Sequence, residues 1–175
     1  MMGWPQIIVL LVAAQRLAEL TVARRNTRRL LADGAEEVGA AHYPLFVVLH
    51  AGWLAALFLA TPPDRPVQIG WLVLFVLLQA GRVWVIASLG RFWTTRIISL
   101  PGAPLVRRGP FLWVRHPNYL IVAGELAVLP LALGEPLLAV LFTILNIPLT
   151  RHRIRIEEEA LAERRPLSPA GSTAP

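Results

Sequence analysis

The sequence predicts an all-α integral membrane protein with five transmembrane helices. Of its 175 residues 55% are hydrophobic and 16% are charged, and the apolar residues gather in five blocks. A soluble domain of this length is rarely so apolar, and blocks of this kind can cross the hydrocarbon core of a bilayer. The chain has no cysteine, which excludes disulfides, thiol catalysis and thiolate metal sites.

The apolar blocks define the expected spans. They cover residues 4–22, 43–60, 67–89, 118–133 and 137–149. The last two are short, because sixteen helical residues reach only about 24 Å, and Gly134-Glu135-Pro136 joins them by a tight turn. We therefore expect a short helical hairpin whose two open ends lie side by side. Pro130 and Pro148 would bend or end its helices.

The distribution of arginine predicts how these spans are oriented. Residues 23–42 hold four arginines, 90–117 five and 151–175 five, whereas 61–66 and 134–136 hold one and none. Five crossings place the three arginine-rich segments on one side of the membrane. By the positive-inside rule that side is the cytoplasm, so the N-terminus is expected outside and the C-terminus inside.

Two polar clusters lie at the open ends of the expected hairpin. The first is Arg115-His116-Pro117-Asn118-Tyr119, and the second is the charged segment 151–159. A residue before proline leaves the α region, and proline starts a helix well. The free amides of such a helix start suit the carboxylate or oxygen atoms of a ligand. The two clusters together therefore form one candidate site.

Side-chain chemistry in the two clusters suits an organic ligand. Asn118 offers a hydrogen-bonding amide, and Tyr119 offers a ring that can stack on a flat base. Arg153 and Glu157 lie four residues apart on a helix. The guanidinium could hold an anionic acceptor, and the carboxylate could hold an amine or ribose hydroxyls.

Ionisable residues elsewhere leave simpler roles open. Arg16 and Glu19 lie three apart within the first span, where we expect an ion pair that locks helix packing. His50 and Glu125 also lie inside apolar blocks, where a functional role and a packing role are both open. The histidines show no paired spacing, so no metal site is expected. Since the arginines lie between apolar blocks, no nucleic-acid partner is expected either.

Two motifs occupy residues 90–161 in a fixed order. The first joins Gly109-Pro110-Phe111 to the segment Val114-Arg115-His116-Pro117-Asn118-Tyr119. The second joins Asn146-x-Pro148 to Arg153-Ile154-x-x-Glu157-Glu158-x-x-Leu161. With a short hairpin between them, these motifs closely resemble the isoprenylcysteine carboxyl methyltransferase family.

This resemblance implies an integral membrane enzyme that uses S-adenosyl-L-methionine, without the soluble Rossmann-type fold. The absence of a G-x-G-x-x-G stretch agrees. It implies that Arg153 orients the acceptor and that Tyr119 also serves catalysis, while Arg96 lines the same pocket. The implied cofactor contacts are Ala103, Pro104, Leu105, Val106, Phe111, His116, Pro117, Asn118, Tyr119 and Glu157. The acceptor's lipid tail would enter from the bilayer.

The N-terminal half resembles small bacterial members of the family. The matching residues are Arg25-Asn26-x-Arg28-Arg29, His42-Tyr43-Pro44 and Leu49-His50-x-x-Trp53. Some of that branch resemble enzymes that methylate the hydroxyl of alkylpyrones or alkylresorcinols made by type III polyketide synthases. The resemblance favours such a hydroxyl or enol acceptor over a prenylated carboxylate, and it makes a type III polyketide synthase a candidate pathway neighbour.

The expected organisation is one membrane methyltransferase domain over residues 1–161. Three spans fill residues 1–89, the cofactor-binding core with the hairpin fills 90–161, and the tail 162–175 is expected to be disordered. The protein is expected in the cell membrane, in contact with lipids, with its active site facing the cytoplasm. Two alternatives stay open: an NADPH-dependent membrane reductase related to sterol reductases, and a non-catalytic membrane module.

Overall fold

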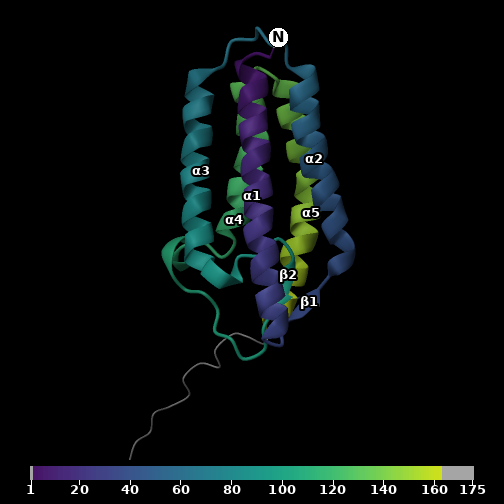
Figure 1. Ribbon diagram of the computed structural model, residues 1–175, viewed down its shortest axis with the longest axis vertical. Coiled ribbons are helices and arrows are strands. Elements are labelled where there is room, and N and C mark those ends of the chain that lie inside the picture. The colour runs from purple at the N-terminus through teal and green to yellow at the C-terminus, as the bar shows by residue number, and fades with distance from the viewer. Residues whose placement is uncertain (1, 163–175) are drawn as a thin grey trace, which may run out of the picture.

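Five α-helices stand side by side in the computed structural model, which describes residues 2–162 (Figure 1). They are α1 (Trp4–Ala32), α2 (Tyr43–Ala60), α3 (Ile69–Leu89), α4 (Pro117–Ala132) and α5 (Pro136–Ala162). Each predicted apolar block corresponds to one helix. Four of the helices are long and apolar enough to cross a membrane, and α4 is a shorter apolar helix. The tail that was expected to be disordered lies almost wholly outside the described residues.

The prediction of an all-α fold is wrong in one respect, because two short strands pair below the bundle. Strand β1 (Glu36–Val38) runs antiparallel to β2 (Ile97–Ser99), with Glu36 opposite Ser99. Strands of three residues are too short to show an alternating pattern that could be read from the sequence. Their pairing ties the end of α1 to the segment that precedes α4. Three short 3-10 helices complete the chain: η1 (Ala40–His42), η2 (Gly90–Phe92) and η3 (Gly109–Leu112).

Two helices are longer than their apolar blocks. The basic run Arg24–Arg29 continues α1, because no proline or glycine interrupts the chain before Gly34, which has a φ of 91°. Helix α5 also extends beyond its apolar block: it does not end at Pro148 but continues through the charged residues as far as Ala162. Of the last two helices only α4 is therefore short, and the expectation of two short helices is wrong for α5.

The last two helices are joined by a tight turn and pack against each other. Gly134 adopts a φ of 76°, which only glycine takes without strain, and the Glu135 amide donates to the carbonyl of Pro130 at 2.8 Å. Because the connection is short, the start of α4 and the last turns of α5 come to lie at the same end of the bundle (Figure 1).

Two apolar clusters form the interior between the helices, and a third, of Leu30, Ala35 and Ile98, lies at the strands. The larger takes residues from all five helices: Val9, Val12, Leu49, Trp53, Leu57, Phe75, Leu126, Val128, Leu129, Leu133 and Phe142. The smaller consists of Ala23, Val85 and Trp93 and lies nearer the strands. Along α1 and α3, charged residues fall between the positions that belong to the two clusters. The interior is therefore layered, with a polar layer between two apolar ones.

The polar layer is a closed ring of alternating charges, which we call the charge ring: Arg16, Glu19, Arg82 and Glu125. Arg16 pairs with Glu19 and with Glu125, each at 2.9 Å. Arg82 pairs with Glu19 at 2.7 Å and with Glu125 at 3.3 Å. No side chain of the ring is more than 14% exposed. The predicted pair Arg16–Glu19 is confirmed, and Glu125, whose role the sequence left open, closes the ring across α1, α3 and α4.

Removing one charge from the ring should destabilise the protein strongly. Glu19→Gln keeps the shape but leaves Arg16 and Arg82 with one carboxylate between them, and an uncompensated buried charge costs about 3–5 kcal/mol. Thermal unfolding in detergent measures the loss. The matched control is Asp33→Asn, since Asp33 pairs with Arg91 where both side chains are at least 50% exposed and such pairs contribute about 1 kcal/mol or less. Equal shifts of the melting temperature in the two variants would contradict the buried ring.

Candidate functional site

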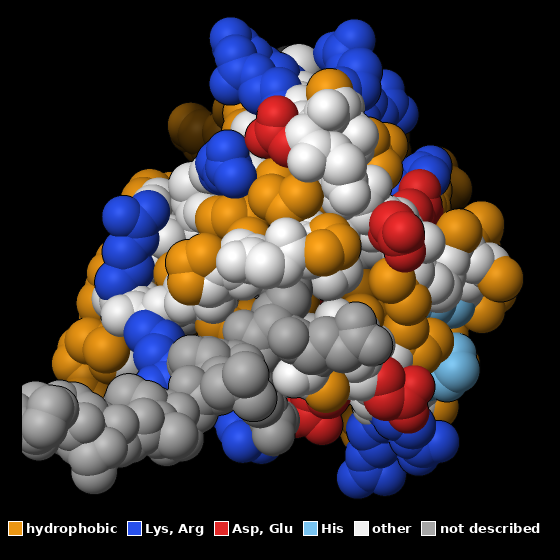
Figure 2. Space-filling view, turned by 90° about the horizontal axis from the view of Figure 1, so that it is seen from below, with side chains coloured by type: hydrophobic (Ala, Val, Ile, Leu, Met, Phe, Trp, Pro, Cys, Tyr) orange, Lys and Arg blue, Asp and Glu red, His pale blue; other side chains and the backbone are white. Residues whose placement is uncertain are grey.

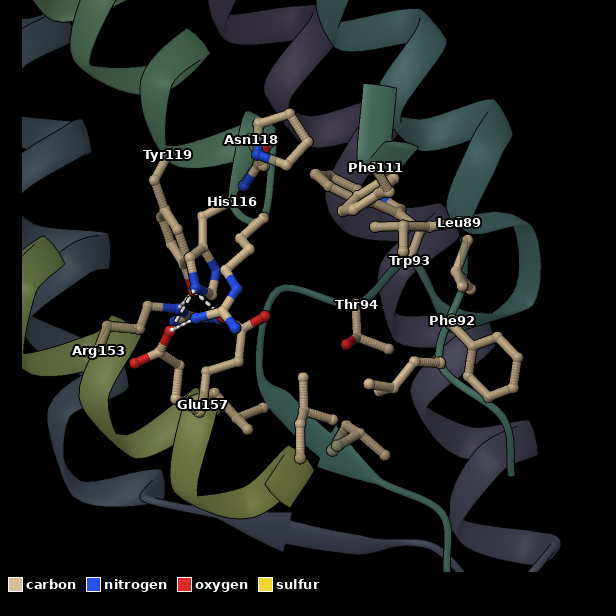
Figure 3. A pocket seen from close by; sticks show the side chains of 18 of the residues that line it. Leu89, Phe92, Trp93, Thr94, Phe111, His116, Asn118, Tyr119, Arg153 and Glu157 are labelled. Carbon is tan, nitrogen blue, oxygen red and sulfur yellow. Dashed lines mark hydrogen bonds and ion pairs between the residues drawn. The ribbon is translucent and has the colours of Figure 1, made fainter. Parts of the chain in front are cut away.

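A cavity of about 460 Å³ opens at the end of the bundle that carries the strands (Figure 3). Its walls come from the end of α3, the segment 92–98, the loop 105–111, the start of α4 and the last turns of α5. Neither α1 nor α2 supplies a described lining residue. The two sequence clusters that were predicted to meet do face each other across this cavity.

Most of the predicted site residues line the cavity. They are Arg96, Leu105, Val106, Phe111, His116, Pro117, Asn118, Tyr119, Arg153 and Glu157. Ala103 and Pro104 are not among the described lining residues. They belong to a turn in which Gly102 has a φ of 74° and the Ala103 amide donates to the carbonyl of Leu100 at 3.2 Å. After Ile98 the chain returns to the cavity wall at Leu105.

The start of α4 presents His116, Asn118 and Tyr119 to the cavity. His116 precedes the first helical residue, Pro117, and its backbone (φ −127°, ψ 60°) lies outside the α region, as the sequence predicts for a residue before proline. The amide of Tyr119 donates to the His116 carbonyl at 3.2 Å, and proline has no amide proton. This helix start therefore offers a ligand fewer free amides than expected, and its side chains carry the polar contacts.

Tyr119 links the two clusters through its hydroxyl. The hydroxyl donates to the carboxylate of Glu157 and accepts a hydrogen bond from Nε of Arg153 at 3.0 Å (Figure 3). Arg153 also donates from Nη2 to the carbonyl of Thr95 at 2.6 Å, and its guanidinium lies over the ring of Phe46 at 5.2 Å. Arg153 is only 8% exposed. A buried cation is thus held in one orientation, with a carboxylate one hydroxyl away.

Two buried polar atoms on residues that line the cavity have no partner among the described residues: Oδ1 of Asn118 and Nε1 of Trp93. The side-chain oxygen Oδ1 of Asn118 is buried and accepts no hydrogen bond from the described residues. A buried acceptor left unpaired costs about 1–3 kcal/mol, and such atoms are rare in folded proteins. A hydrogen-bond donor on a ligand in the cavity would satisfy this oxygen.

Salt bridges border the cavity on the side of α5. Glu158 accepts a contact from Nε2 of His116 at 3.3 Å and pairs with Nη1 of Arg115 at 3.6 Å. These side chains are partly or largely exposed. The pairing connects the loop before α4 to the last turns of α5, at the rim of the cavity.

The sequence missed the wall formed by the last residue of α3 and the segment that follows it. Leu89, Phe92, Trp93, Thr94, Ile97 and Ile98 line the cavity. Apart from Thr94, these side chains are apolar or aromatic, in a stretch that otherwise reads as a basic linker. The adjacent Phe92 and Trp93 were the available signal, because two aromatic residues between arginines are unusual in a solvated connection.

A family model for the isoprenylcysteine carboxyl methyltransferase (ICMT) family matches residues 71–163, which is more than half of the chain. The chain belongs to this family. Every described residue that lines the cavity falls within the matched range. With its four long apolar helices, this ICMT family member is a multi-pass membrane protein of a methyltransferase family.

Two relatives match over nearly the whole chain. The uncharacterized protein YpbQ of Bacillus subtilis (strain 168) is 36% identical over 166 residues, which are 93% of this chain and 98% of YpbQ. An uncharacterized protein of Haemophilus influenzae is 29% identical over 163 residues, which are 90% of this chain and 94% of that protein. No solved structure gives a significant match. The similarity to both relatives includes the N-terminal helices that the family model leaves out.

Two substitutions at the start of α4 should differ in their effect on stability. Asn118→Leu removes a buried oxygen that has no partner, so we expect the melting temperature without ligand to stay unchanged or rise. Tyr119→Phe leaves Nε of Arg153 without its acceptor, so we expect a loss of about 1–3 kcal/mol. Thermal unfolding of the two purified variants makes the comparison. An Asn118→Leu protein as unstable as Tyr119→Phe would mean that Asn118 serves the fold and not a ligand.

Proposed function

We propose that this ICMT family member transfers a methyl group from S-adenosyl-L-methionine to an oxygen of a lipophilic acceptor. Acceptors of this class include alkylpyrones, alkylresorcinols and prenylated carboxylates. The observation that carries the proposal is the cavity itself, which is lined by a fixed guanidinium, a carboxylate and an asparagine whose side-chain oxygen has no partner among the described residues. The family match supports methyl transfer as the reaction class.

The residues around the cavity fit the methyl donor chemically. A volume of about 460 Å³ lies within the range of cavities that hold cofactor-sized ligands. Oδ1 of Asn118 would accept a hydrogen bond from an amine or a hydroxyl, and the carboxylate of Glu157 suits a cationic or hydroxyl group. Phe111 and Trp93 offer aromatic faces on which a purine can stack. The set therefore provides partners for the amine, hydroxyl, sulfonium and purine groups of the donor.

The protein's part in the reaction is alignment, exclusion of water and control of charge. When bound, the cofactor supplies a sulfonium methyl group that is already a strong electrophile. Arg153 is held by Thr95 and Tyr119, so its guanidinium can stabilise the anionic form of an acceptor oxygen without reorganising. A neutral hydroxyl acceptor would also need a base. Glu157 is the candidate, because its carboxylate is linked to the Arg153 guanidinium by the hydroxyl of Tyr119.

The proposed location is the cell membrane, with the cavity facing the cytoplasm. The cavity lies at the end of the bundle opposite the start of α1 (Figure 1). Seen from that end, basic side chains surround the face (Figure 2), and in this chain they are all arginines. The positive-inside rule supports a cytoplasmic face there and an outside N-terminus. An acceptor carrying an alkyl chain would reach the cavity from the bilayer, and a type III polyketide synthase would be a fitting supplier.

Isothermal titration of the detergent-solubilised protein tests the proposal against its alternatives. We expect binding of S-adenosylhomocysteine and none of NADPH. Binding of NADPH alone would favour a membrane reductase and contradict methyl transfer. Binding of neither would favour a non-catalytic membrane module and would contradict it equally.

Substitution of the two charged residues on α5 should nearly abolish methyl transfer. Arg153→Ala removes the cation that faces the acceptor, and Glu157→Ala removes the carboxylate, so each should lower turnover by about 100-fold or more. The measurement is transfer of labelled methyl from S-adenosyl-L-methionine to an alkylresorcinol in vesicles. Arg155→Ala and Glu159→Ala are matched controls, because both residues lie exposed on the same helix, outside the cavity lining. Full activity in either cavity variant would refute the assignment.

A further inference from the structure

Trp93 is a buried residue in the wall of the cavity, and the residues that hold it in place lie outside the cavity lining. The residue follows η2 and is only 3% exposed. One side of its environment is the cavity, and the other is the small apolar cluster with Ala23 and Val85. The position of this indole determines the shape of the cavity wall on which a flat ligand group would stack. The contacts that hold the indole can therefore affect ligand binding.

One face of α1 reaches Trp93 although α1 lines no part of the cavity that the structure describes. Glu19, Ala23 and Asn26 follow one another at helical spacings of four and three, so they share a face. Ala23 is fully buried against Trp93. Asn26 donates from Nδ2 to the carbonyl of Trp93 at 2.9 Å and to the carbonyl of Gly90 at 3.2 Å. The amide thus holds the backbone at both ends of η2.

The third residue of that face acts on the indole through Arg82. Glu19 accepts three contacts from Arg82, from Nε at 2.8 and 2.9 Å and from Nη2 at 2.7 Å. The guanidinium so fixed lies over the ring of Trp93, 5.7 Å from its centroid. A planar cation held over an indole face attracts it electrostatically, and more strongly where both are shielded from water. Backbone and ring of Trp93 are thus each tied to α1.

We propose that the face Glu19–Ala23–Asn26 of α1, together with Arg82, is a positioning element that sets Trp93 as a wall of the cofactor cavity. The inference rests on the proposed function and extends it to a helix outside the family match, since residues before 71 are not covered by that match. These are positioning residues, because they hold Trp93 directly or, for Glu19, through Arg82, and none of them lines the cavity. Substitutions that weaken these contacts should lower the affinity for the ligand more than other substitutions that lower the melting temperature equally.

The first test compares two amide side chains of α1 that make the same kind of bond. Asn26→Leu cuts the bonds to the backbone of η2, and Gln6→Met cuts a buried bond from Gln6 to the carbonyl of Thr61 at 2.7 Å. Thr61 lies outside the cavity lining. We expect Asn26→Leu to weaken S-adenosylhomocysteine binding by at least about fivefold, while Gln6→Met leaves it within about twofold. Equal affinity changes at equal loss of melting temperature would overturn the proposal.

The second test uses two arginines of the charge ring. Arg82→Lys keeps the charge but loses the planar group over Trp93, whereas Arg16→Lys makes the same change away from that indole. We expect only Arg82→Lys to weaken S-adenosylhomocysteine binding, although both variants lose stability. This pair keeps the proposal falsifiable where Asn26→Leu fails to fold. If Arg82→Lys and Arg16→Lys lost affinity in proportion to their loss of melting temperature, the proposal would be refuted.

A measurement without ligand separates this inference from the proposed function. The chain has six tryptophans, so 5-fluorotryptophan labelling gives a ¹⁹F resonance for each, and Trp93→Phe assigns one of them by its loss. We expect Asn26→Leu to shift or broaden the Trp93 resonance and Gln6→Met to leave it in place. An unmoved resonance in Asn26→Leu would overturn the inference. If the wild type bound no S-adenosylhomocysteine, the proposed function would fail while this result still decided the role of α1.

Discussion

The charge ring is the interaction on which the rest of the structure depends. Arg16, Glu19, Arg82 and Glu125 lie deep in an apolar bundle, where each charge is tolerable only because two opposite charges contact it. The ring allows essentially one relative position of α1, α3 and α4, because sliding one helix by a turn would separate its charges. The end of α3 and the start of α4 are thereby fixed, and these two ends form walls of the cavity.

At the cavity the buried charges are paired differently from those of the charge ring, since the cavity must accept a ligand. Arg153 is buried like the ring arginines, but it is held by a hydroxyl and a carbonyl and not by a direct carboxylate. Its charge is therefore less neutralised and stays available to an anionic group. Glu157 stands one hydrogen bond further, behind Tyr119. The same bundle thus contains a layer in which every charge is paired and which serves the fold. It also contains a buried cation without a direct carboxylate partner, which faces the cavity.

Hydrophobic blocks and a short connection were enough to predict five helices and one end that forms a pocket, and the family resemblance supplied half of the residues that line the cavity. The helices and their common end follow from local pattern and from the short connection near Gly134, both of which can be read along the chain. The strands β1 and β2 could not be predicted, because three-residue strands exist only through their pairing. The wall at Trp93 was missed for a similar reason, since its burial depends on α1, which is distant in sequence.

The central claim is that the cavity between α4 and α5 holds the methyl donor. A structure of the full-length protein in lipid with S-adenosylhomocysteine bound tests this most directly. The account predicts density for the ligand inside the cavity, with a donor group within hydrogen-bond distance of Oδ1 of Asn118 and with the sulfur directed toward Arg153. Ligand density elsewhere, with the cavity left unchanged, would contradict it.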